Sequence, residues 1–203
     1  QKHAYKQMLA KLAMEYQGDQ VLAVNEAVKM QKLLQIACGV VYGEDQDIYL
    51  PAKPRIEVVR EIVEEAGTKT IVFVPFKGVL KYVASELAKD FTVEMISGET
   101  SKSERDRIFH DFQHTGSPRV LVAQPAAMSH GLTLTAANTV VWFAPVTSNE
   151  IYEQANARVT RPGQKHTQFV VNIEGSEVER RLYNRLRDKQ KLQGLLLEMV
   201  RSS

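Results

Sequence analysis

Five short β-rich runs, most of them apolar on consecutive positions, constrain the fold of this 203-residue chain more than any other feature. Consecutive rather than alternating apolar residues are typical of a parallel strand that is covered on both faces. Strands that alternate with helices imply right-handed crossovers, and therefore an α/β fold with an open, mostly parallel sheet flanked by helices. The predicted strands are Thr70–Val74, Thr92–Ile96, Arg119–Ala123, Thr139–Phe143 and Gln168–Ile173.

Helix-start signals support this alternation. Three hydroxyl-x-x-Glu patterns, beginning at Thr147, Ser101 and Ser176, read as capping boxes. The predicted helices are Arg55–Glu65, Lys77–Lys89, Ser101–Gln113, Thr147–Val159 and Ser176–Gln190.

The regions that flank the alternating pattern differ from it in composition. Residues 2–37 are rich in Ala, Leu, Met, Lys and Gln, which favours helix, and residues 39–54 carry turn signals and read as a connector. We therefore predict an N-terminal helical segment and connector over residues 1–50, an α/β lobe over 51–175, and a C-terminal helix over 176–203.

Composition bounds the function without identifying it. A net charge of +2 does not by itself call for nucleic acid, although it allows a local basic face. The single cysteine, Cys38, excludes a disulfide framework and a cysteine-based zinc cluster, and we expect a reducing, cytoplasmic location. The five histidines show no evident metal-ligand spacing, so no metal site is predicted, and no apolar run is long enough for a membrane span. Because the chain opens at Gln1 rather than methionine, we expect a fragment of a longer protein.

Polar and glycine residues follow the predicted strands, where ligands of open α/β sheets bind. Hydroxyls and backbone amides there are suited to a nucleic-acid phosphate backbone. The structural alternatives are a tight turn for the glycines and helix capping for Thr100 and Thr147. The candidate nucleic-acid residues are Ser97, Gly98, Thr100, Gln124, Ser129 and His130.

The segment Gln154–Gln164 carries the most specific pattern. It sets Arg158 in the predicted last turn of a helix and Arg161 just past it, because Pro162 and Gly163 end the helix. Two guanidiniums held this way form a cationic fork that suits phosphate oxygens. The alternative is a solvated basic helix end that complements the helix dipole.

The flanks of these arginines resemble the C-terminal motor lobe of superfamily-two helicases, and most closely the Swi/Snf-type DNA translocases and their phage relatives. Gln154, Ala155, Arg158, Arg161, Gly163 and Gln164 match the family's last motif, Q-A-x-x-R-x-x-R-x-G-Q, in order. Residues 131–143, 70–74 and 98–105 resemble three earlier motifs, and the likeness runs from about Ala52 to Lys191.

The resemblance implies a RecA-like lobe with a C-terminal helix that braces it against a second lobe. It further implies that Arg158 and Arg161 are catalytic arginines for the γ-phosphate of ATP, with Gln154, Gly131 and Thr133 at the nucleotide. ATP and Mg²⁺ are then held mainly by an N-terminal RecA-like lobe, which is the expected partner together with nucleic acid, most often double-stranded DNA. The sequence contains no G-x-x-x-x-G-K-[ST] loop, so the chain alone is expected to be inactive.

Several alternatives stay open at this stage. Gln124, Pro125, Ala126 and Thr133 depart from the family pattern, which leaves a non-catalytic α/β nucleic-acid-binding module as a rival. An RNA helicase or a restriction-type translocase lobe is the closer rival. The default interpretation of the basic segment Arg180–Lys191 is a solvated helix face. Contact of this segment with a second lobe, and contact with a phosphate backbone, are two further interpretations of equal weight. We also expect both arginines to be partly exposed, on the same sheet edge as the Gly98 and Gly131 loops.

Overall fold

The computed structural model describes residues 6–7, 23–41, 48–49, 52–128, 133–161, 164, 166–190, 195 and 198–199. The chain divides into two compact units. One comprises residues 53–173, and the other combines residues 1–52 with residues 174–203. Ser129, His130 and Gly131, three of the predicted site residues, lie outside the described residues, as do Pro162 and Gly163.

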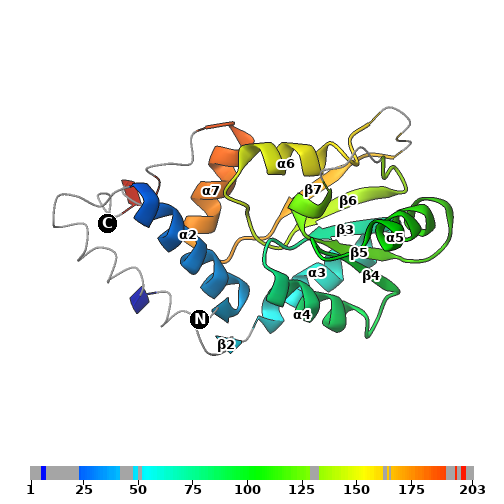
Figure 1. Cartoon of the computed structure of the whole chain (residues 1–203), viewed down its shortest axis with the longest axis horizontal. Helices are drawn as coiled ribbons and strands as arrows, with labels where there is room; N and C mark the ends of the chain where they lie inside the picture. Colours follow the sequence, from blue (N-terminus) through cyan, green and yellow to red (C-terminus); the bar gives the residue numbers. More distant parts are fainter. Residues whose placement is uncertain are drawn as a thin grey trace. The chain divides into compact units, whose positions relative to one another are not determined.

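The unit of residues 53–173 is built on a five-stranded sheet in the order β4-β5-β3-β6-β7 (Figure 1), in which all pairs are parallel. This confirms the predicted α/β sheet. The strand bounds differ from the predicted ones by one or two residues: β3 Lys69–Phe73, β4 Val93–Ile96, β5 Val120–Ala123, β6 Ala137–Trp142 and β7 Phe169–Asn172.

Helices cover both faces of this sheet, as right-handed crossovers require. From β3 the chain moves to the edge strand β4, and from β4 it returns in the opposite direction through β5 and β6 to β7. Right-handed crossovers in opposite directions lie on opposite faces, so α3 and α4 pack together on one face and α5 and α6 lie on the other (Figure 1). The helices are α3 Lys53–Glu65, α4 Lys77–Leu87, α5 Lys102–His114 and α6 Asn149–Asn156, and a short 3₁₀ turn, η1, spans Pro125–Met128.

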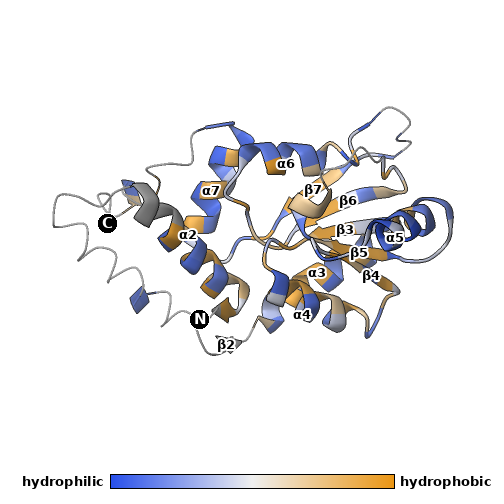
Figure 2. Ribbon diagram, in the orientation of Figure 1, coloured by the Kyte–Doolittle hydropathy of each residue, from blue (hydrophilic) through white to orange (hydrophobic). Residues whose placement is uncertain are grey.

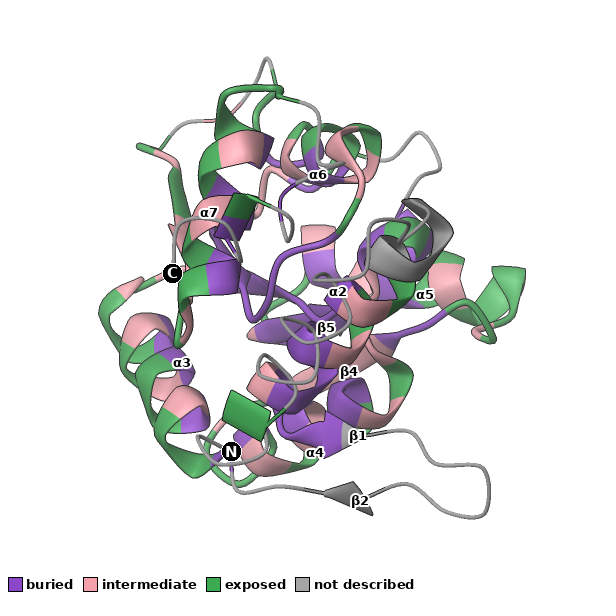
Figure 3. Cartoon of the chain, turned by 90° about the vertical axis from the view of Figure 1, so that its left-hand side faces the viewer, coloured by how far each residue is buried: buried purple, intermediate pink, exposed green. Residues whose placement is uncertain are grey.

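The core of this unit lies between the sheet and the inner faces of these helices. The central strands β3, β5 and β6 are apolar and buried along most of their length, whereas the helices are hydrophilic and exposed on their outer sides (Figures 2 and 3). The rings of Phe73, Trp142 and Tyr152 form a continuous stack with centroid separations of 4.8 and 4.7 Å. Trp142 Nε1 donates to Asn156 Oδ1 at 2.9 Å, so α6 is fixed to the end of β6 by both stacking and a hydrogen bond.

The helix caps correct one prediction. Ser101 caps α5 as expected, with its Oγ accepting from the Glu104 N–H. Helix α6, however, is capped by Ser148, whose Oγ accepts from the Ile151 N–H at 3.3 Å, so the capping box predicted at Thr147 is wrong. Two adjacent hydroxyls can each cap a helix, and the sequence alone does not separate them.

The second unit contains α2 Ala23–Cys38, an antiparallel pair formed by β1 Val40–Val41 and β2 Ile48–Tyr49, and α7 Glu177–Arg187. The region predicted as a connector therefore carries a small β ribbon. Helix α7 contacts α2 within this unit.

Helix α7 begins at the predicted capping box. Ser176 Oγ accepts from the Glu179 N–H at 3.3 Å, and the buried Glu179 carboxylate accepts from Ser176 Oγ and the Gly175 N–H, each at 2.9 Å. Val178, Leu182 and Leu186, spaced four residues apart, form a buried apolar face. Arginines of this helix have intramolecular acidic partners: the exposed Arg180 pairs with Glu174, the partly exposed Arg181 with Glu177, and the largely buried Arg185 with Glu198.

Candidate nucleotide and nucleic-acid sites

The loop after β4 is fixed by its own side chains. The Ser97 N–H donates to Thr100 Oγ1 at 3.0 Å, and the Thr100 N–H donates to the Ser97 carbonyl at 3.1 Å. Ser97 Oγ in turn accepts from the Glu99 N–H at 3.2 Å. Thr100 thus stabilises the loop rather than capping α5, and the loop holds a defined shape without a ligand.

Gln124 joins this loop to the end of β5. Its N–H donates to the Ile96 carbonyl at 2.9 Å, and its side-chain Oε1 accepts from the Gly98 N–H at 3.0 Å. The structure therefore brings together Ser97, Gly98, Thr100 and Gln124 at the carboxyl ends of β4 and β5. With Lys77 and Glu99, described next, these residues form what we call the carboxyl-edge cluster.

Lys77 and Glu99 were missed as site residues by sequence reasoning. Lys77 opens α4 after β3, and its Nζ forms an ion pair with Glu99 Oε1. The hydrogen bond from Lys77, reinforced by its positive charge, lowers the pKa of Glu99. A lysine in the first helical position after a parallel strand and its short loop is the signal that could have identified this residue.

Gly98 does not need to be glycine for the backbone conformation or for packing. It is exposed, it is not among the positive-φ glycines of the described residues, and a Cβ built on it meets nothing within 4 Å. The predicted tight turn is present, since the Thr100 N–H to Ser97 carbonyl bond closes a turn that contains Gly98, but this turn does not require a glycine. The missing side chain of Gly98 leaves open space, while the Gly98 N–H is bonded to Gln124 Oε1.

The arginine segment, residues 157–164, lies at the other end of the sheet. The Arg158 carbonyl accepts from the Leu134 N–H at 3.0 Å, and Gln164 Nε2 donates to the Ala137 carbonyl at 2.7 Å. Ala137 is the first residue of β6, so this segment runs beside the amino end of that strand. The expectation that the arginines share an edge with the Gly98 loop is wrong, because the short α6 carries the chain back from the carboxyl edge.

The two arginines differ in environment. Helix α6 ends at Asn156, so both lie beyond it, and Arg158 is not in its last turn as predicted. Arg158 is 6% exposed, which contradicts the expected partial exposure, whereas Arg161 is exposed as expected. Burial lowers the pKa of Arg158, and the nearby charge of Arg161 lowers it further. Two neighbouring guanidiniums, one desolvated, make a site that an anion would stabilise.

Thr133 contacts Arg161, whereas Gln154 bonds to neither arginine. Arg161 Nη1 donates to Thr133 Oγ1 at 3.5 Å and its Nε donates to the Ala157 carbonyl at 3.2 Å. Gln154 is exposed on α6, and its amide donates to Glu150 Oε1 at 3.0 Å. Thr133 therefore lies beside Arg161, at a position that departs from the family pattern.

A family model described as the helicase conserved C-terminal domain matches residues 54–163. The chain belongs to this family.

Relatives and solved structures refine the assignment of the helicase lobe. The chain is 34% identical, over 54% of its length, to SWI/SNF-related matrix-associated actin-dependent regulator of chromatin subfamily A-like protein 1 of Xenopus tropicalis, and it covers 12% of that protein. It is 26% identical over 97% of its length to putative protein p41 of Acyrthosiphon pisum secondary endosymbiont phage 1, of which it covers 43%. The lobe thus spans less than half of these relatives.

The solved structure of the Sulfolobus solfataricus SWI2/SNF2 ATPase core in complex with dsDNA matches 93% of the lobe at 25% identity, with a TM-score of 0.68, and 41% of that structure is covered. These matches identify a C-terminal RecA-like lobe of a Swi/Snf-type superfamily-two helicase.

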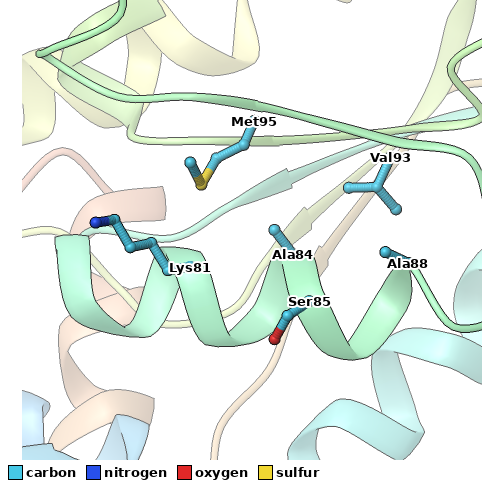
Figure 4. Close-up of a pocket in the computed structure, with 6 residues that line it drawn as sticks. All are labelled: Lys81, Ala84, Ser85, Ala88, Val93 and Met95. Carbon is cyan, nitrogen blue, oxygen red and sulfur yellow. The ribbon is translucent and has the colours of Figure 1, made fainter.

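Other features of the helicase lobe lie apart from both sites. A shallow pocket of about 280 Å³ lies between α4 and β4 and is lined by Lys81, Ala84, Ser85, Ala88, Val93 and Met95 (Figure 4). In the part of the chain that the structure describes, no helix is long and apolar enough to cross a membrane.

The histidines require one correction. His110 and His114 lie four residues apart on α5 with ring centroids 5.0 Å apart, a spacing that can bind a metal and that the sequence reasoning overlooked. Within the described ranges, however, no group of three or more His, Cys, Asp or Glu side chains is placed to hold a metal ion.

Proposed function

We propose that this lobe is the C-terminal half of an ATP-dependent DNA translocase or helicase and supplies two arginines to the terminal phosphate of ATP. The observation that carries the proposal is the arrangement of Arg158 and Arg161, which lie three residues apart on a segment fastened to the backbone at Leu134 and Ala137. Side chains held by a rigid segment need little reorganisation to meet developing negative charge.

The donor set fits one end of a nucleotide. Two guanidiniums and the Thr133 hydroxyl suit phosphate oxygens, and Gly131 and Gln154 are the further residues that we assign to this site. The phosphate loop and acidic residues that hold ATP and Mg²⁺ belong to the N-terminal RecA-like lobe, the principal partner in this proposal. ATP hydrolysis supplies the free energy for movement, while Arg158 and Arg161 orient and neutralise the transferred phosphate.

The carboxyl-edge cluster is our proposed contact with the nucleic-acid backbone. Besides the Glu99 carboxylate, its groups are hydroxyls, amides and a lysine, which hold phosphates without reading sequence. Ser129 and His130 belong to the same loop in the sequence and are assigned with it. The match to a solved Swi/Snf core in complex with dsDNA supports duplex DNA as the substrate.

Steady-state ATP hydrolysis by the purified chain and by its parent protein tests the proposal. We expect no turnover by the chain above background, with or without duplex DNA, and DNA-stimulated turnover by the parent. Robust ATP turnover by the chain that is retained in both Arg158→Ala and Arg161→Ala would contradict the proposal.

A further inference from the structure

The Lys77–Glu99 ion pair spans the carboxyl edge of the sheet. Strand β5 lies between β3 and β4, Lys77 follows β3, and Glu99 follows β4. The pair therefore extends over the end of β5, where Gln124 holds the Gly98 N–H. An acidic side chain thus lies at the centre of the surface that we assign to a polyanion.

Solvent reaches both partners of this pair. The side chains of Lys77 and Glu99 are 46% and 71% exposed. Exposed ion pairs contribute little to stability, so this pair can exchange at small cost. Because the loop of residues 97–100 is held by its own hydrogen bonds, the release of Lys77 leaves the loop intact.

The positive charge near Glu99 exceeds what one carboxylate neutralises. Lys81, one helical turn after Lys77, also contributes to the lowered pKa of Glu99. A carboxylate and a phosphate accept hydrogen bonds from the same lysine ammonium, and the phosphate lies on a chain that carries further charges for further contacts. Glu99 therefore accepts the hydrogen bond that a phosphate oxygen could accept from Lys77.

We propose that Lys77 binds a nucleic-acid phosphate and that Glu99 is its intramolecular competitor, which a bound backbone displaces. This inference rests on the proposed function, because it requires that the carboxyl edge faces nucleic acid. Such competition weakens the hold on the backbone, which suits a protein that must release each phosphate in order to step.

A double-mutant cycle on duplex binding tests the inference. Fluorescence anisotropy with a labelled random-sequence duplex, at several salt concentrations, compares the unmodified chain with Lys77→Gln, Glu99→Gln and the double variant. Glu99→Gln should bind roughly two- to fivefold more tightly, the range set by one exposed ion pair. Lys77→Gln should weaken binding, with a salt slope shallower by about 1.

The double variant identifies the route of the effect. If Glu99 acts through Lys77, its substitution gives no gain once Lys77 is glutamine, whereas a general charge effect persists in that background. Glu86→Gln is the matched control, since it removes one carboxylate of an exposed lysine pair at the far end of the same helix.

The possible failures are distinguishable. The competitor role is overturned if Glu99→Gln leaves duplex affinity unchanged, or if it gives an equal gain in the Lys77→Gln background. The carboxyl edge still stands as a binding surface in that case if Lys77→Gln weakens binding. An absence of duplex binding at low salt by both the unmodified chain and Glu99→Gln overturns this inference and the proposed nucleic-acid contact together.

Discussion

Replacing Arg158 by methionine should stabilise the isolated lobe, although a buried side chain is altered. Arg158 is 6% exposed, and burial and the charge of Arg161 both lower its pKa. A basic group whose pKa is lower in the folded than in the unfolded state destabilises the fold at every pH below that folded pKa. The guanidinium stays charged at neutral pH, so the penalty is present there.

The expected magnitude follows from charge repulsion. Two unit charges about 4 Å apart repel by about 1 kcal/mol in bulk water and about 4 kcal/mol at an effective dielectric constant of 20, and charges on side chains farther apart repel by less. Methionine keeps an unbranched apolar stem of similar length, so most packing survives. We therefore expect the free energy of unfolding of Arg158→Met to rise by about 0.5–2 kcal/mol.

Urea denaturation at neutral pH measures this change. Added sulfate provides a second reading, because an anion bound between the two arginines stabilises the unmodified lobe by mass action and Arg158→Met more weakly. A fall of more than about 1 kcal/mol in Arg158→Met, together with an equal sulfate response, would refute the reasoning and make Arg158 a structural residue.

Three further results are expected. Gln164→Met, which removes the hydrogen bond to the amino end of β6, should lower the free energy of unfolding by about 1 kcal/mol and kcat of the parent about tenfold or more, with little change in KM. The hydrogen bond from Arg107 lowers the pKa of Glu104, so this pair stabilises the fold above the ordinary carboxyl pKa, and the stabilisation is lost as pH falls. Between about pH 5 and 3, the urea midpoint of Glu104→Gln should therefore fall less than that of the unmodified chain. Because Glu198 already pairs with Arg185, Arg185→Gln should leave duplex affinity within about twofold.

The controls for these predictions use the same assays. Thr92→Val removes a side-chain acceptor from the Arg119 N–H, away from the arginine segment, and should leave kcat unchanged. A normal kcat in Gln164→Met would show that the arginine segment does not depend on that hydrogen bond. A marked loss of duplex affinity in Arg185→Gln, with a shallower salt slope, would place α7 on the phosphates.

Strand positions were predictable because physical chemistry leaves few options for them. Runs such as Thr70–Val74 and Thr139–Phe143 are apolar on both faces, and parallel strands covered by helices are what such runs form. The order of the strands was not predictable, because β3 pairs with β5 and β6, which are distant in sequence.

The geometry around the candidate site residues was less predictable than the strands. The motif pointed to Arg158 and Arg161, but no local pattern reveals the burial of Arg158 or the bond between its carbonyl and the Leu134 N–H. The sheet edge was predicted incorrectly because the length of α6 decides it. The Lys77–Glu99 pair was missed for a similar reason, since it joins two loops that meet only through the strand order.

The turnover number of the DNA-stimulated parent ATPase, with Arg158→Lys and Arg161→Lys measured separately, tests the central claim most directly. Lysine keeps the charge but loses the planar fork, so an effect cannot be attributed to charge removal alone. We expect kcat to fall by about 10³-fold or more for each variant, with duplex affinity retained, while the matched Arg107→Lys on α5 stays near the unmodified value. A kcat within about threefold of the unmodified parent in both variants would show that these arginines do not act on the phosphate, and would contradict the account.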